Sequence, residues 1–140
     1  MPTTTISQIR QGLATNLGTI SEIQVSPYML VSPLPPVIHI FPAGIDYDRS
    51  MHRGLDILTF TVEAFVAMGL DKGAQMKIDL FLSPTGTLSV KAAIEADKTL
   101  GGLVDDTWVE RVSGYRLVEL PEMEQKALSA DWLVRVNSSL

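Results

Sequence analysis

The stretch Ile57-Leu-Thr-Phe-Thr-Val-Glu-Ala-Phe-Val66 decides the fold. Apolar side chains occupy every second position from Leu58 to Val66, and the residues between them are Ile57, Thr59, Thr61, Glu63 and Phe65. Successive side chains of a strand point to opposite faces of a sheet. This period of two therefore predicts a strand with one buried face and one partly solvated face.

A second strand is predicted just upstream, at Val37-Ile-His-Ile-Phe41. We expect Pro42 to stop it, because proline has no backbone N–H to donate to the ladder. The polar connection from Ala43 to Gly54 is rich in turn formers, which predicts that the two strands are antiparallel neighbours. Still further upstream, Thr19 to Ser26 predicts a short extended segment that ends near Pro27.

Two more strands are predicted towards the C-terminus. The range Trp108 to Leu120 predicts a long strand, bent by a β-bulge at Ser113-Gly114. The last strand has its apolar residues on one face, at Ala130, Trp132, Val134 and Val136. We expect the two tryptophans to anchor the core.

The first helix is predicted from a capping box, in which Thr5 and Gln8 satisfy each other's backbone amides. Its apolar face recurs at three- and four-residue spacing, at Ile6, Ile9, Leu13 and Leu17. Gly18 stands where a left-handed C-terminal cap is expected, and Gly12 should weaken the helix slightly.

Two consecutive helices are predicted in the middle of the chain. Asp71 can cap a helix over residues 72–82, which Ser83-Pro-Thr-Gly86 ends. Ser89 can cap a short third helix from Val90 to Asp97, before the break at Gly101-Gly102.

The order of these elements is helix, strands, two helices, two strands. It predicts an α+β fold with a mostly antiparallel sheet of four to five strands, and with the N-terminal helix and the two sequential helices packed on one face. At 140 residues, the chain should form a single domain, 1–140, around one core.

Composition excludes several classes of function. The chain has no cysteine, which excludes disulfides, thiolate metal sites and a cysteine nucleophile. Its 11 basic and 16 acidic residues give a net charge of -5, and the basic ones are scattered, so we expect no electrostatic capture of nucleic acid. No secretory signal or membrane-span pattern occurs, and we expect a protein made in a reducing cytoplasm without membrane partners.

The sequence offers few candidates for catalytic or metal-binding residues. His39 alternates with apolar neighbours, which favours a hydrogen-bonded structural histidine over a metal ligand. Asp46 and Asp48 could supply oxygen ligands, but the EF-hand spacing is missing. A small hydrolytic or ligand-binding domain would need Asp46, Asp48 and His52 to converge in a cleft. The doublet Asp105-Asp106 predicts a turn or cap rather than acid–base catalysis.

No nucleophile elbow, phosphate-binding glycine loop or H-E-x-x-H helix occurs in the chain. We therefore expect no enzyme activity, no metal and no cofactor.

A Pro-rich arm at about residues 27–36 is the most unusual feature. Its prolines favour an extended, polyproline-like path that needs a surface to lie on. Exposed apolar arms usually contact partners, so the candidate interface residues are Tyr28, Met29, Leu30, Val31 and Leu34. Alternatively, the arm folds back over the edge of its own sheet.

The region from Leu88 to Val109 resembles part of the tail-terminator, or tail-completion, proteins of long-tailed bacteriophages. Three groups of residues carry the resemblance: Ser89-Val90, Leu100-Gly101-Gly102 and Val104-Asp105-Asp106. Each has a structural reason, since serine caps a helix, glycines adopt positive φ and aspartates bond turns. The rest of the chain is similar in layout, with an I-x-x-I-R helix and a P-V-I-H-I-F-P strand.

The resemblance implies a virion protein of the tail or neck that assembles as a ring, typically of six subunits, on the last ring of the tail tube. Its partners would be further copies of itself, the tail-tube protein and a head-closure or connector protein. The alternatives are another neck component, such as a head-closure or adaptor subunit, or the tail-tube protein itself.

The size of the domain is compatible with such a ring. A compact 140-residue domain has a radius of gyration of about 14 Å, and hence a diameter of ~37 Å as a sphere. Six touching spheres leave a hole as wide as one sphere, which admits a DNA duplex. An acidic subunit would let that DNA pass without specific binding.

Overall fold

The computed structural model describes residues 5–20, 23–30, 36–46, 56–67, 71–120 and 125–138. Within them, the helices are α1 (Ile6–Leu17), α2 (Asp71–Leu82) and α3 (Val90–Glu95). The strands are β1 (Gln24–Ser26), β2 (Val37–Asp46), β3 (Asp56–Ala67), β4 (Asp106–Leu120) and β5 (Gln125–Ser138).

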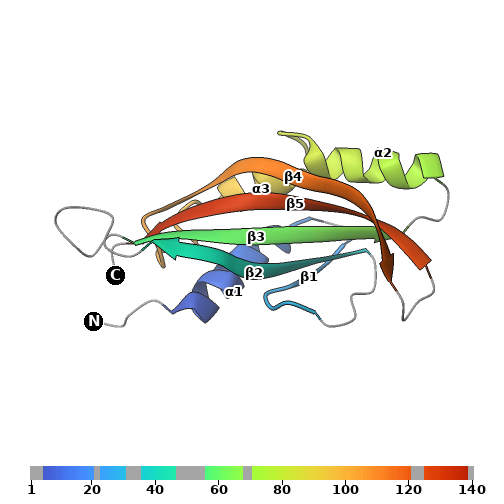
Figure 1. The fold of residues 1–140 in the computed structure, drawn as a ribbon. Coiled ribbons are helices and arrows are strands. Elements are labelled where there is room, and N and C mark those ends of the chain that lie inside the picture. The colour runs from blue at the N-terminus through green and yellow to red at the C-terminus, as the bar shows by residue number, and fades with distance from the viewer. Residues whose placement is uncertain are drawn as a thin grey trace.

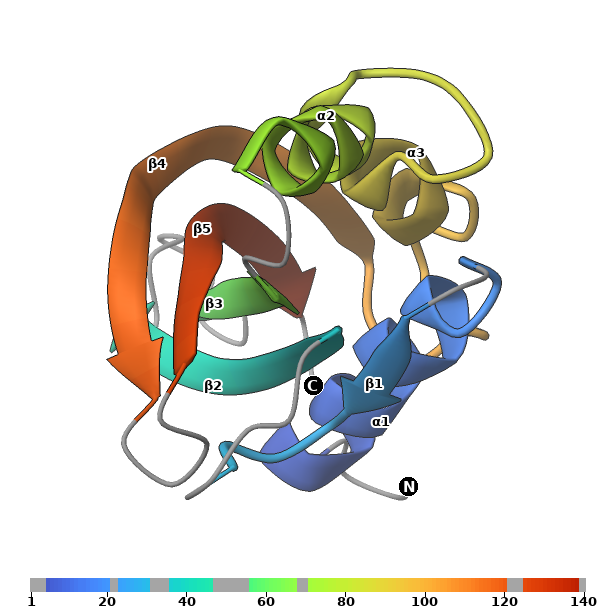
Figure 2. The same ribbon diagram turned by 90° about the vertical axis from the view of Figure 1, so that its right-hand side faces the viewer.

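The five strands form a sheet in the order β1-β2-β3-β5-β4 (Figure 1). β1 pairs with β2 in parallel, and every other neighbouring pair is antiparallel. β1 and β4 are therefore the two edges of the sheet. Figure 2 shows α1 beside β1, and α2 and α3 together beside β4. The chain has the predicted α+β fold.

The main core lies between the helices and one face of the sheet. The strand residues that face it alternate as the sequence predicts, and Phe60, Val62, Trp132 and Val134 are all fully buried. The helices contribute Leu13, Leu17, Ile78, Phe81 and Ile94 to the same cluster. A smaller cluster on the opposite face joins Val37, Phe65 and Ala127, with Leu30 and Val118 packed against it. No residue of the described helices belongs to this cluster, and we call this side of the sheet the helix-free face.

The prediction that Pro42 stops its strand is wrong. β2 continues to Asp46, and its register with β3 shifts between Pro42 and Gly44. β1 pairs with β2 only from Val37 to His39, so beyond that point β2 has a paired neighbour on one side only. A residue without an N–H is tolerated at such an edge, next to a bulge.

The end of α1 also differs from expectation. Gly18 has a φ of -63°, so it is right-handed and does not form a left-handed cap. The backbone continues in tight turns, with the N–H of Ile20 donating to the carbonyl of Leu17. These turns occupy the start of the predicted extended segment, and within the described residues its strand is Gln24–Ser26.

The bulge predicted in β4 is confirmed. The register with β5 shifts between Ser113 and Arg116, and Gly114 has a φ of +69°. A second shift lies between Val109 and Arg111. The third helix ends two residues earlier than predicted, at Glu95, and the chain then follows turns to the start of β4.

Candidate functional site

The residues that resemble the phage family form a joint between α3 and β4. Ser89 is buried, and its side-chain oxygen accepts a hydrogen bond from the N–H of Ala92 at 3.1 Å, which caps α3 as predicted. Its hydroxyl also donates to the carbonyl of Ser83, at the end of α2. One side chain thus ties the two helices together.

A left-handed turn follows α3. Leu100, Gly101 and Gly102 have φ values of 52°, 73° and 91°. The predicted role of the two glycines is confirmed, since a side chain at positive φ is strained. Asp97 stabilises the turn, because its Oδ2 accepts a hydrogen bond from the N–H of Gly101 at 2.9 Å. The strained residue, Leu100, is buried in the main core.

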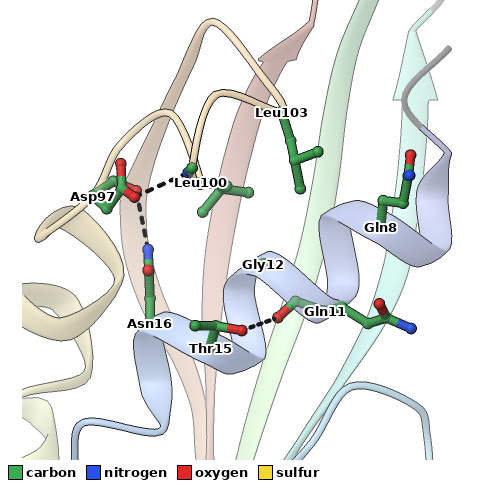
Figure 3. A pocket seen from close by; sticks show the side chains of 9 residues that line it. Gln8, Gln11, Gly12, Thr15, Asn16, Asp97, Leu100 and Leu103 are labelled. Carbon is green, nitrogen blue, oxygen red and sulfur yellow. Dashed lines mark hydrogen bonds between the residues drawn. The ribbon is translucent and has the colours of Figure 1, made fainter. Parts of the chain in front are cut away.

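The N-terminal helix α1 packs against this turn and is hydrogen-bonded to it (Figure 3). The Nδ2 of Asn16 donates to the carbonyls of Ile94 and Asp97, both at 3.0 Å. One turn earlier, Gly12 lies so close to the turn that a Cβ there would be 3.0 Å from the Cβ of Leu100. Gly12, which the sequence suggests only as a weak point of the helix, is what permits this close approach.

A hollow of about 280 Å³ lies beside this contact, between α1 and the turn (Figure 3). Most of its polar side chains are already paired. Gln8 completes the capping box with Thr5, the Thr15 hydroxyl donates to the carbonyl of Gln11, and Asn16 bonds the turn. Through these pairings the lining of the hollow belongs to the structural contact between α1 and the turn.

The acidic doublet sits where the joint enters the sheet. The N–H of Asp105 donates to the carbonyl of Asn137 on β5, and Oδ1 of Asp106 accepts from the N–H of Thr107. Glu95 adds a contact that the sequence did not suggest, since its Oε2 accepts from the N–H of Val109 at 3.0 Å. Although burial raises the pKa of Glu95, hydrogen bonds from Lys91 and Val109 lower it overall.

The described part of the candidate interface is Tyr28 to Leu30. We call Tyr28 and Met29, which are 41% and 56% exposed, the arm patch. Arg10 stacks on the Tyr28 ring, with its Cζ 5.2 Å from the ring centroid. Leu30 packs on the helix-free face of the sheet. Val31 and Leu34 lie outside the described residues.

A polar network crosses the helix-free face and reaches the arm. His39 is buried, its Nδ1 accepts from the N–H of Leu30 at 3.0 Å, and its Nε2 lies 2.7 Å from Oε1 of Glu63. The other oxygen of Glu63 accepts from Arg116, which also pairs with Asp131 at 3.2 Å. The prediction of a hydrogen-bonded structural histidine is confirmed.

Burial and charge act differently on the two carboxyls of this network. Burial raises the pKa of Glu63, but the hydrogen bond and charge of His39, with Arg116 and Ser129, lower it below its ordinary value. For Asp131, burial and the neighbouring Glu63 outweigh the attraction of Arg116, so its pKa is raised. The charged form of Glu63 is therefore favoured, mainly by His39 and to a smaller extent by Arg116, whereas the charged form of Asp131 is disfavoured.

A second exposed apolar surface lies along the opposite edge of the sheet. We call the exposed apolar side chains of β4, which are Val112, Tyr115 and Leu117, the β4 patch. On α2, Met76 and Leu80 are also exposed, and they border a hollow of about 420 Å³. Because β1 and β4 are opposite edges, the arm patch and the β4 patch lie at opposite ends of the strand order.

Two other expectations concern ligands and membranes. Among the residues that the structure describes, no group of three histidine or acidic side chains could hold a metal ion. Asp46 ends β2, whereas Asp48 and His52 lie outside the described residues. The described helices include none that is long and apolar enough to cross a membrane.

No known protein-family model matches the chain, and a search of curated proteins finds no significant match.

Proposed function

We propose that this chain is a virion structural protein that assembles into a ring of six copies at the end of the tail tube of a long-tailed bacteriophage. There it stops elongation of the tube and provides the surface to which the head joins. Its partners are other copies of itself, the tail-tube protein and a head-closure or connector protein. DNA passes through the lumen without specific binding.

The observation that supports self-assembly is the pair of exposed apolar surfaces at opposite edges of one sheet. A ring is built from head-to-tail contacts, in which each subunit uses two different surfaces. The arm patch beside β1 and the β4 patch meet this requirement. Assignment to a tail terminator rests on the resemblance of Leu88 to Val109, a region in which Ser89 caps α3 and Gly101 and Gly102 have positive φ.

Electron microscopy of the purified chain tests the proposal. A closed annulus with an open lumen supports a terminator, and long tubes would favour a tail-tube protein instead. Deleting Tyr28 to Leu34 should leave a folded monomer that forms no ring. Unchanged oligomers in light scattering would contradict the role of the arm.

Point variants separate the two surfaces without removing backbone. Met29→Lys and Leu117→Lys each place a charge in one patch and should each prevent ring closure. Thr85→Lys is the matched control, because Thr85 is exposed and belongs to neither patch. When the Met29 and Leu117 variants are mixed, one intact contact remains between unlike copies, so a heterodimer should form. Failure to form that heterodimer would contradict head-to-tail assembly through these patches.

A further inference from the structure

The hydrogen bonds of His39 indicate which ring nitrogen carries the proton in the neutral form. Its Nδ1 accepts from a backbone N–H, that of Leu30, at 3.0 Å. A ring nitrogen that accepts has no hydrogen of its own. The proton of the neutral ring is therefore on Nε2, which donates to Oε1 of Glu63 at 2.7 Å. One imidazole thus connects the segment after β1 to strand β3.

Among the residues that the structure describes, the groups around this ring are two aromatic rings and a few charged side chains. The rings of Phe41 and Phe65 meet it edge to face, with centroids 5.6 and 5.3 Å away. The charged groups that approach from neighbouring strands are Glu63 on β3, Arg116 on β4 and, beyond Arg116, Asp131 on β5. Residues 23–30, which include Leu30, carry no charged side chain.

We propose that proton uptake by His39 releases the segment Tyr28–Leu30 from the sheet. The incoming proton binds the lone pair of Nδ1, which is the pair that accepts from Leu30. The charged ring then presents an N–H to the N–H of Leu30, and two donors cannot share a hydrogen bond. The Leu30 amide must turn away to water.

The same step leaves the other end of the ring in place. Glu63 remains a carboxylate, because its pKa is lowered, and it continues to accept from Nε2. A charged ring strengthens that bond, since hydrogen bonds between ionised groups are stronger than neutral ones. Arg116 limits this gain by competing for the same carboxylate. The contact that is lost is therefore the one to Leu30.

The segment that would be released has few other attachments. β1 is three residues long, and Met29 is exposed. The Tyr28 backbone bonds the hydroxyl of Ser26, which accepts from its N–H at 3.3 Å and donates to its carbonyl at 2.8 Å, and Gln11 donates to the Tyr28 hydroxyl at 3.5 Å. Leu30 is half-buried against the small cluster on the helix-free face. Histidine is the side chain that most often acts as a proton switch near neutral pH, so the signal that we propose is mild acid. The proposed response to pH involves contacts within a single chain and does not depend on ring assembly.

Nuclear magnetic resonance of the full chain tests the proposal in two readouts. The ¹⁵N shifts of His39 report whether Nδ1 is bare at pH 8 and protonated at pH 5. Amide exchange of Leu30, corrected for its intrinsic pH dependence, should accelerate by about fivefold to tenfold over the same range, as expected for one lost hydrogen bond. The amide of Val134, in a strand paired on both sides, is the internal reference.

His39→Gln removes the titration and should abolish the acceleration, whereas His52→Gln removes the only other histidine and should keep it. If His39→Gln does not fold, the wild-type titration decides alone. Protonation of Nδ1 without faster exchange at Leu30 would overturn the proposal. So would a His39 ring that stays neutral down to pH 5, or acceleration that persists in a folded His39→Gln variant.

Discussion

A Cβ atom added to Gly12 on α1 would lie 3.0 Å from the Cβ of Leu100, in the left-handed turn after α3. The neighbour cannot yield easily, because a Cβ is fixed to the backbone and Leu100 is buried.

We therefore expect Gly12→Ala to destabilise the protein. Alanine favours a helix over glycine by about 1 kcal/mol, but overpacking in a core costs about 1–3 kcal/mol. The free energy of unfolding in urea should fall by roughly 1 kcal/mol. Gly73→Ala is the matched control, since nothing lies within 4 Å of that helical position, and it should be stabilising. Equal effects at both positions would show that the close approach is unimportant.

Asn16 should be sensitive to the loss of its donor. Asn16→Ala leaves the carbonyls of Ile94 and Asp97 without this partner, at a cost of about 1–3 kcal/mol in the free energy of unfolding. Asn16→Asp should be worse, because a carboxylate can only accept and would face two carbonyl oxygens. Thr15→Ala, which removes an exposed hydroxyl bonded within its own helix, is the control and should change little.

Alanine variants of Gly114 and Gly101 distinguish the energetic cost of backbone strain from that of steric crowding. Both have positive φ, so alanine at either position should cost about 1–2 kcal/mol in unfolding free energy. A Cβ on Gly101 meets nothing within 4 Å, whereas one on Gly114 would lie 2.6 Å from a guanidinium nitrogen of Arg116. Gly114→Ala should therefore be the more destabilising, with the ion pair of Arg116 and Asp131 disturbed. Thermal unfolding of the two variants gives the comparison.

Glu63 should contribute to stability in a way that depends on pH. Its pKa in the folded state is lowered from 4.5, so its contribution is complete above about pH 4.5 and is lost as the pH falls through the folded value. Asp131 has a raised pKa and acts in the opposite direction, since acid relieves the cost of burying its charge. Urea unfolding between about pH 6 and pH 3 should show a flatter profile for Glu63→Gln than for the wild type. An unchanged slope would contradict this role.

Local patterns predicted most of the fold. Alternation of apolar residues located β3 and β5, the capping residues Thr5 and Ser89 located two helix starts, and Gly114 located a bulge. These features depend on neighbours within a few positions, which is why a sequence reveals them.

The contacts that were missed join residues far apart in the chain. Asn16 bonds Ile94 across 78 positions, and nothing near either residue indicates the other. The network of His39, Glu63 and Arg116 depends on the register of three strand pairings. A slip of one residue moves a side chain to the opposite face, so alternation alone does not bring these groups together. The parallel pairing of β1 was missed for the same reason.

The position of β5 has a consequence for the growing chain during synthesis. β5 lies between β3 and β4, and it pairs with β3 along its length, from Asp56↔Ser138 to Ala67↔Ala127. The ribosome makes β3 and β4 before it makes β5, the strand that lies between them, so in a nascent chain these two strands lack their common partner. Pairing over such long separations is slow and exposes aggregation-prone edges. The sheet can therefore close only after the whole of β5 has left the ribosome.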